Sequence, residues 1–334
     1  FTSIILSTIL VTSSNSWLLA WLGLELNLFA ILPVISKTKH PRAIEAATKY
    51  FLTQATASCL LLSSSTINAW QTGTWSILQT SDKLPTTVML VALTMKIGTT
   101  PTHFWLPEVM QGTTPLISML IATWQKIAPM ILIFSISSHA PSKISIVLGL
   151  LSTFSGGWGG MNQTQLRKIM AFSSIANTGW TLMTITYELK TSMINFFLYI
   201  ILTTPMFLAM ARTSTKTLQD MTTLWTTSAT TSMMLMLLLL STAGLPPLTG
   251  FMPKLLILNE LVAQSLTPVA VLTAMSSLLT LVFYLRVTYL TSLLNPPNSS
   301  TSTAKWRLNT NNQEMAAMTP TATISMPVLP ALCY

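Results

Sequence analysis

The chain has 334 residues; 50% of them are hydrophobic, 7% are charged, and the formal net charge is +9. Soluble proteins carry about 25% charged residues, so this composition excludes a soluble globular chain and favours one that crosses a membrane several times. The positive charge does not indicate nucleic-acid binding, because the basic residues lie between apolar runs and form no basic cluster with interleaved aromatic residues.

Cysteines and short motifs give no sign of a cofactor or metal site. The two cysteines, Cys59 and Cys333, are far apart and share no C-x-x-C motif, which argues against a disulfide framework, a zinc site or an iron–sulfur cluster. The sequence contains no dinucleotide fingerprint, no H-E-x-x-H and no G-x-S-x-G motif. We therefore expect no redox or hydrolytic chemistry, no cofactor and no metal in this chain.

Eleven apolar segments predict membrane spans. In chain order they cover residues 1–12, 17–35, 50–69, 84–104, 115–134, 144–160, 169–187, 192–211, 232–266, 269–290 and 315–332. The ninth is too long for one helix and is interrupted by the glycine- and proline-containing string 244–250, whereas the polar residues 295–313 predict a loop. The chain begins at Phe1 inside an apolar run without a basic leader or cleavage motif, so we expect a truncated first span and no targeting peptide.

The basic residues between these segments are distributed unevenly. Three of them, Lys83, Lys143 and Lys190, fall on one side of the predicted membrane. The other side collects ten: Lys37, Lys39, Arg42, Lys49, Arg167, Lys168, Arg212, Lys216, Lys305 and Arg307. The positive-inside rule places the side with ten toward the cytoplasm or the matrix. It thereby places the N-terminus on that side and the C-terminus on the opposite side.

Charged residues also lie inside the predicted spans: Glu25, Lys96, Lys126 and Lys254, with Glu260 and Arg286 in less central positions. Lys96 precedes Pro101, whose ring interrupts a helix, and Lys254 follows three prolines of the ninth segment. We expect both helices to be interrupted, at 96–101 and 244–254. Two interrupted spans in separate halves predict two inverted repeats around a site near the membrane midplane, roughly residues 1–134 and 144–291.

The cost of burying these charges favours a function in ion transfer. Each charge at the centre of a bilayer costs about 2.5–3.5 kcal/mol. Burial disfavours the charged form of a lysine, so a buried lysine can take up and release a proton near neutral pH. We predict that Glu25 lies within about 10 Å of Lys96 and controls its charge, and that Lys96 passes its proton toward Lys126. The alternative is that these lysines belong to kinked helices and extend their ammonium groups to the interface.

Four further features carry weaker indications. His103 follows the first break and is either a proton relay or a structural histidine. Glu108 is expected to be solvated or to cap a helix, and Arg167 is expected, with its neighbour Lys168, to be solvated in a loop. The glycine-rich string 156–160 lacks the G-K-[ST] of a phosphate loop and instead predicts close packing of two helices.

Several long strings resemble the chain 2 family of mitochondrial NADH–ubiquinone oxidoreductase, the antiporter-like membrane subunits of respiratory complex I. The strings are residues 17–25, 41–46, 49–55, 103–109, 159–169 and 244–254, so the resemblance extends over nearly the whole chain. It implies proton-channel roles for the positions that match Glu25, Lys96, Lys126 and Lys254. It also implies a mitochondrial inner-membrane location, neighbouring antiporter-like and other complex I subunits as partners, and NADH, FMN, iron–sulfur clusters and ubiquinone bound by those partners.

The sequence departs from this family at a few positions. Thr100 and Thr102 stand around the first break, where the family usually has alanine and phenylalanine. Asn177 stands where the family usually has histidine. Because an amide does not titrate near neutral pH, we expect no titrating role at that position.

The sequence as a whole predicts an all-α, multispanning bundle of about eleven transmembrane helices, forming one antiporter-like domain over residues 1–334. Its predicted function is proton translocation as a non-redox subunit of NADH:ubiquinone reductase. A subunit of a free-standing cation/proton antiporter is the alternative. A structural membrane adaptor with vestigial charges is a third reading.

Overall fold

The computed structural model describes residues 2–80, 82–226, 228–293 and 320. Within them all regular elements are helices, and pairing between extended residues is limited to two isolated bridges. The predicted all-α class is confirmed. The elements are α1 (Thr2–Ser13), α2 (Trp17–Ser36), α3 (Pro41–Thr72), α4 (Lys83–Ile97), α5 (Trp105–Gly112), α6 (Pro115–Ala122), α7 (Trp124–Ile136), α8 (Ser142–Met161), α9 (Leu166–Thr184), α10 (Leu189–Thr213), α11 (Leu218–Thr222), the 3-10 turn η1 (Leu224–Thr226), α12 (Ala229–Ala243), α13 (Phe251–Ala263) and α14 (Thr267–Ser292).

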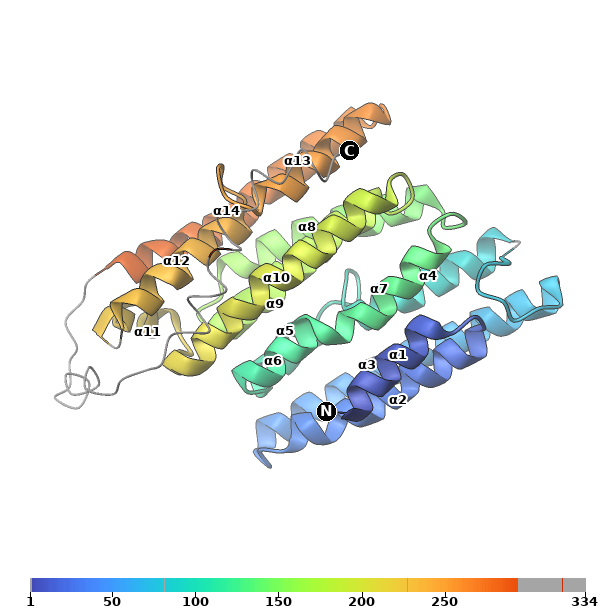
Figure 1. Cartoon of the computed structure of the whole chain (residues 1–334), viewed down its shortest axis with the longest axis horizontal. Helices are drawn as coiled ribbons and strands as arrows, with labels where there is room; N and C mark the ends of the chain where they lie inside the picture. The colour runs from blue at the N-terminus through green and yellow to red at the C-terminus, as the bar shows by residue number, and fades with distance from the viewer. Residues whose placement is uncertain (1, 81, 227, 294–319, 321–334) are drawn as a thin grey trace.

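The long helices lie nearly parallel to one another (Figure 1). The helices of the first part of the chain, blue to teal in that view, lie on one side, and the green to orange helices lie on the other. α5 and α6 join the two sides, because they pack on α9 and α10. One hydrophobic core crosses this junction and includes Trp105 and Met110 of α5, Met170 of α9 and Met206 of α10.

Both predicted helix interruptions are present. α4 ends at Ile97 and α5 begins at Trp105, while α12 ends at Ala243 and α13 begins at Phe251. Gly98 and Gly244 cap the first half of each pair with positive φ angles of 87° and 82°, which glycine adopts without the steric cost that a side chain would bring. A cis peptide bond follows each cap, between Thr100 and Pro101 and between Pro246 and Pro247.

A third interruption was not predicted. The segment 115–134 was expected to be one helix, but Thr123 divides it into α6 and α7. The backbone N–H of Lys126 donates to the carbonyl of Thr123 at 3.3 Å and not to that of Ala122, so the carbonyl of Ala122 lacks its usual helical partner. Pro129 has no N–H to donate to Gln125, which weakens the same turn further.

The predicted boundaries of the third segment were too short. α3 begins at Pro41, the favoured first position of a helix, and His40 caps it by accepting a hydrogen bond from the N–H of Arg42. The helix therefore runs for 32 residues, longer than a bilayer core requires. The last predicted span, 315–332, and the loop 295–313 lie outside the described residues, except for Pro320.

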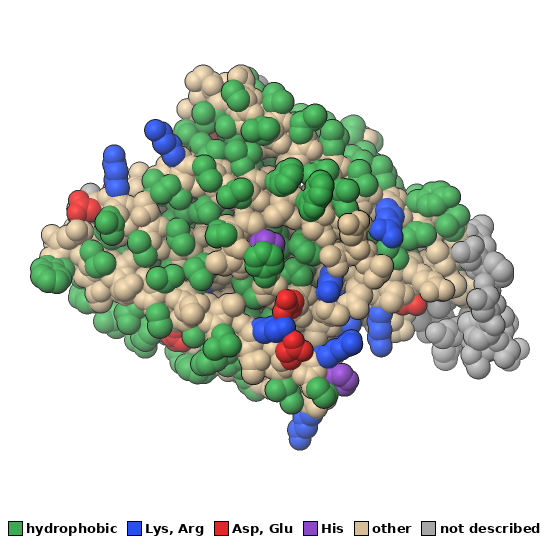
Figure 2. All heavy atoms as spheres, turned by 180° about the vertical axis from the view of Figure 1, so that it is seen from behind, with side chains coloured by type: hydrophobic (Ala, Val, Ile, Leu, Met, Phe, Trp, Pro, Cys, Tyr) green, Lys and Arg blue, Asp and Glu red, His purple; other side chains and the backbone are tan. Residues whose placement is uncertain are grey.

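Five helices of the described chain are long and apolar enough to cross a membrane: α2, the pair α6 and α7 taken together, α8, α10 and α14. The total of eleven spans and the two repeats stay predictions. Figure 2 shows hydrophobic side chains spread over the middle of one face, with most charged side chains toward its lower right and a smaller group at its upper left. That distribution is typical of a protein whose two polar ends flank an apolar belt.

The glycine-rich string packs two helices closely, as predicted. A Cβ placed on Gly156 of α8 would lie 2.7 Å from the backbone N of Ala176 and 2.8 Å from the carbonyl O of Phe172, both on α9. Only a residue without a side chain permits this approach. The prediction of helix packing by this string is confirmed.

Candidate functional site

Lys96 is the second-last residue of α4, directly before the first break, and only 6% of it is exposed. The helix ends there, so the carbonyl of Lys96 has no partner within α4; Gln54 of α3 supplies one by donating from Nε2 at 3.1 Å. Glu25, half-buried on α2, is near enough to act electrostatically on Lys96. The two described side chains do not form a salt bridge with each other.

Lys126 lies in the first turn of α7, just after the break at Thr123, and 2% of it is exposed. Its ammonium donates to the carbonyl O of Ser174 on α9 at 3.3 Å. The same Nζ is 5.6 Å from the centre of the Tyr199 ring, within the range of a cation–π contact. The charge is therefore partnered by one carbonyl and one aromatic face.

A small cavity joins Lys96 and Lys126. Its volume is about 20 Å³, and its lining includes both lysines together with Asn27, Tyr50, Gln54 and Gln125. One ordered water requires roughly 10–15 Å³ and two to four polar partners, and both conditions are met here. The sequence predicted that the two lysines are neighbours in a proton path. It did not predict that the amide side chains of Asn27, Gln54 and Gln125 line the same cavity.

Lys254 lies in the first turn of α13, just after the second break, and is half-buried. Its Nζ donates to the carbonyl O of Ala243, the last residue of α12, at 2.7 Å. Carbonyls at a helix C-terminus carry partial negative charge and favour a cation. A second cavity of about 20 Å³ is lined by Lys254, Asn177, Asn195 and Tyr199, among others.

His103 is 9% exposed and lies between the two halves of the first broken helix. Its ring is 4.2 Å from that of Phe104 and 6.5 Å from that of Phe172, measured between ring centres. Nδ1 is buried without a hydrogen-bond partner. His103 lines neither of the two cavities, so its role as a relay stays a prediction while its packing role is visible.

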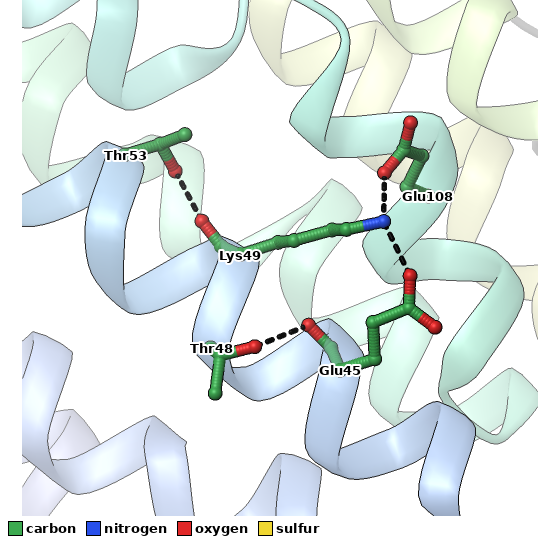
Figure 3. Close-up of polar contacts among 5 residues, drawn as sticks. All are labelled: Glu45, Thr48, Lys49, Thr53 and Glu108. Atoms are coloured by element: carbon green, nitrogen blue, oxygen red, sulfur yellow. Dashed lines mark hydrogen bonds and ion pairs between the residues drawn. The ribbon is translucent and has the colours of Figure 1, made fainter.

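At the more basic end, Lys49 of α3 lies between two carboxylates (Figure 3). Its Nζ is 2.5 Å from Glu45, one turn earlier on α3, and 2.6 Å from Glu108 on α5. Glu108 was expected to be solvated or to cap a helix; its side chain is 49% exposed, as expected, and it also joins α5 to α3 by an ion pair. Arg167 was expected to be solvated, but its guanidinium donates to the carbonyl of Thr113, in the link between α5 and α6.

The described residues contain no group of three His, Cys, Asp or Glu side chains that could hold a metal ion. Cys59 is a free, exposed cysteine on α3, and Cys333 lies outside the described residues. The side chains that could act chemically in the interior of the described chain include lysines, amides and hydroxyls, together with His103 and the half-buried Glu25. Such groups bind and transfer protons or hold water.

Sequence reasoning did not identify Gln54, Asn195 or Tyr199. Each is a polar residue within an apolar run, and several other polar residues in the chain have the same signal without lying near the site. The break at Thr123 also carries a weak signal, because Pro129 lies six residues later and is itself inside α7. These residues became candidates only when their contacts with the lysines were seen.

A family model described as NADH:quinone oxidoreductase/Mrp antiporter, TM, matches residues 14–280, and one described as NADH dehydrogenase subunit 2 C-terminus matches residues 281–333. The chain is 50% identical over 304 residues to NADH-ubiquinone oxidoreductase chain 2 of Salmo salar, covering 91% of this chain and 87% of that protein. It is 49% identical over 331 residues to the same protein of Aquarana catesbeiana, covering 99% and 96%.

Solved structures share the fold. A chain of respiratory complex I from Thermus thermophilus superposes with a TM-score of 0.86 at 24% identity, covering 99% of this chain and 78% of that one. A chain of the Mrp complex from Dietzia sp. gives a TM-score of 0.81 at 18% identity, covering 89% and 60%. The extent of the family match and the identity to these relatives agree with the motifs seen in the sequence, and the chain belongs to the NADH-ubiquinone oxidoreductase chain 2 family.

Proposed function

We propose that this chain conducts protons through the mitochondrial inner membrane as a subunit of NADH–ubiquinone oxidoreductase, using Glu25, Lys96, Lys126 and Lys254. The observation that carries the proposal is the cavity that Lys96 and Lys126 share, because it places two buried cations around a volume that can hold water. In this proposal NADH, FMN, iron–sulfur clusters and ubiquinone are bound by other subunits. The chain then takes part in the enzyme's reaction only through proton movement.

The first step is controlled by the charge of Glu25. Two unit charges about 4 Å apart interact by roughly 4 kcal/mol at an effective dielectric constant of 20, and the interaction shrinks as the charges separate. While the Glu25 carboxylate is close and ionised, Lys96 keeps its proton. When the carboxylate is withdrawn or protonated, the ammonium of Lys96 gives its proton to water in the shared cavity, and Lys126 accepts it from there.

The proton on Lys126 is next transferred toward Lys254. The ammonium of Lys254 donates a hydrogen bond to the carbonyl of Ala243 at the end of α12. A carbonyl stabilises a cation less than a carboxylate would, so Lys254 keeps the ability to release its proton. A relay through His103 would act beside the first break and outside these two cavities. The direction of transfer is set by the electrostatic state of Glu25 at one end of this series.

We further propose that the end of the bundle carrying Lys49, Arg167 and Lys216 faces the matrix, since basic residues accumulate on that side. The N-terminus then lies on the matrix side and the C-terminus on the intermembrane-space side. The chain forms one domain of two repeats, roughly residues 1–134 and 144–291, with a final span at 315–332. The pairing of two glycine-capped breaks, after Ile97 and after Ala243, supports the repeat proposal.

Replacing Lys126 tests the proposal. We expect Lys126→Met to abolish NADH-driven proton translocation by this subunit in the reconstituted complex, because methionine preserves length and removes the titrating group. Lys143→Met, at an exposed lysine on α8, is the matched control. The proton-to-electron stoichiometry and the rate of NADH oxidation are measured together. An unchanged stoichiometry with normal turnover in Lys126→Met would refute the role of this lysine.

A cation/proton antiporter subunit is the second candidate, because the matching family model also covers Mrp antiporters and the Mrp complex shares the fold. The two candidates respond differently to a sodium gradient. Vesicles containing the complex are given a sodium gradient without NADH, and the internal pH is followed. Acidification or alkalinisation that depends on sodium and on Lys126 would favour the antiporter.

A further inference from the structure

We propose that the hydrogen bond between Asn27 of α2 and Gln125 of α7 positions Lys126 at the cavity that it shares with Lys96. The inference rests on the proposed function, because it assigns two residues that act through one of its lysines. Gln125 Nε2 donates to Asn27 Oδ1 at 3.1 Å, and both side chains line the shared cavity. An amide does not titrate near neutral pH, so the pair acts by holding Lys126 and not by carrying the proton itself.

The turn of α7 that carries Lys126 has weak hydrogen bonding of its own. The N–H of Lys126 donates to the carbonyl of Thr123 at 3.3 Å, which is a longer bond than usual. In a regular helix residue 129 would donate to the carbonyl of Gln125, but that residue is Pro129 and has no N–H. Two side-chain bonds join this turn to other helices, one from Gln125 to α2 and one from Lys126 to α9.

These two side-chain bonds respond differently to proton transfer. Lys126 Nζ donates to the carbonyl of Ser174 at 3.3 Å. A bond from a charged donor is roughly twice as strong as one between neutral groups, so this bond weakens whenever Lys126 gives up its proton. The bond between the amides of Asn27 and Gln125 has no titrating partner. It therefore holds the turn in place in both charge states of Lys126.

Asn27 and Gln125 join two helices that pack mainly on other helices. α2 packs mainly on α1 and α3, and α7 packs mainly on α4. Asn27 is 4% exposed and Gln125 is half-buried, so breaking their bond would leave amide groups unpaired in an interior where this is costly. Because α2 also carries Glu25, the bond fixes the helix of that carboxylate relative to the turn of Lys126.

The other lysine of the cavity is held in a comparable way. Gln54 of α3 donates to the carbonyl of Lys96 at 3.1 Å, so an amide from a neighbouring helix fixes the position of each lysine. The cavity of about 20 Å³ has room for roughly one water between them. A misplacement of about 1 Å can slow a reaction between positioned groups a hundredfold. The distance between the two lysines is therefore the quantity that the amide pair controls.

Exchanging the lengths of the two amide side chains tests the pair. Gln125→Asn is one methylene shorter, which takes the donor beyond the roughly 2.7–3.2 Å of a hydrogen bond. We expect NADH-driven proton translocation by the reconstituted complex to fall about two- to tenfold, the factor that the net contribution of one hydrogen bond implies. The double variant Asn27→Gln with Gln125→Asn restores the combined length and is expected to restore translocation. Gln71→Asn, the same shortening at an exposed glutamine of α3, is expected to behave as wild type.

Two measurements separate positioning from a contribution to stability alone. A misplaced Lys126 makes proton transfer rate-limiting, so Gln125→Asn is expected to be slowed more by heavy water than wild type, and the double variant is expected to lose this difference. Heat inactivation and the amount of assembled complex are measured on the same preparations. A loss of translocation that follows heat resistance, without a larger heavy-water effect, would assign the pair a structural role only and refute the proposal.

The remaining outcomes also decide. Wild-type translocation in Gln125→Asn would refute the role of the pair, and so would an assembled double variant that stays as slow as Gln125→Asn. Should the added methylene at the buried Asn27 prevent assembly of the double variant, Gln125→Met decides, since it keeps the length of glutamine and removes the donor. Slow translocation with a larger heavy-water effect there supports the proposal, and wild-type behaviour there refutes it.

Lys126→Met in the same assay distinguishes failure of the pair from failure of the proposed function. If Lys126→Met stops translocation and the Gln125 variants pump at the wild-type rate, the role of the pair is wrong and the proposed function stands. If Lys126→Met itself pumps normally, the proposed function fails and the role of the pair fails with it.

Discussion

The hydrogen bond from Gln54 to the carbonyl of Lys96 is a contact for which the effect of a substitution can be worked out from the structure. The bond is 3.1 Å long, both residues are buried, and no N–H of α4 can replace it because the helix ends one residue later. Gln54→Leu keeps the approximate volume and removes the donor. An unsatisfied buried carbonyl costs about 1–3 kcal/mol, part of which the apolar leucine recovers.

A net cost of about 1–2 kcal/mol corresponds to a factor of roughly 5–30 in an equilibrium constant. We expect Gln54→Leu to reduce the population in which Lys96 faces the shared cavity by this factor, and NADH-driven proton translocation to fall to a similar degree. Gln71→Leu, at an exposed glutamine of the same helix, is the matched control.

The assay for Gln54→Leu is NADH-driven acidification in proteoliposomes, normalised to the amount of assembled complex. Heat inactivation of the same preparations shows whether the loss reflects stability alone. Translocation and heat resistance both equal to those of Gln71→Leu would refute the reasoning, since the bond would then contribute nothing to the position of Lys96.

Two further changes address the packing around the site. Gly156→Leu is expected to overpack α8 against Ala176 and to destabilise the fold by about 1–3 kcal/mol, seen as less assembled complex; normal assembly would contradict the close approach. Lys49→Met is expected to leave the carboxylate of Glu108 without its cation and to loosen α5 from α3, lowering heat resistance. The difference from wild type should shrink at about 1 M salt, where the Debye length is about 3 Å, and a difference that persists there would exclude the ion pair as its cause.

The sequence by itself determined the class of the protein and predicted its candidate site residues. A charged fraction of 7% excludes a soluble globular protein. Prolines in apolar runs predict where helices must break, because proline lacks an N–H and collides with the preceding turn. Both predicted breaks are present, and Lys96 and Lys126 are buried as expected. These inferences succeed because they depend on local backbone chemistry and on the cost of charge in lipid.

The tertiary structure alone decided which side chains surround the lysines. The break at Thr123 arises without a proline at that position, and it matters because it frees a carbonyl that Tyr199, far away in sequence, then contacts. Glu108 is exposed as expected but also pairs with Lys49 across two helices, and Arg167, expected to be solvated, donates to a carbonyl in the link between α5 and α6. Such contacts depend on how the helices are rotated about their axes and how deeply they pack against one another. Neither property can be read from the hydrophobic periodicity of these segments, because a nearly uniformly apolar helix is hydrophobic on every face.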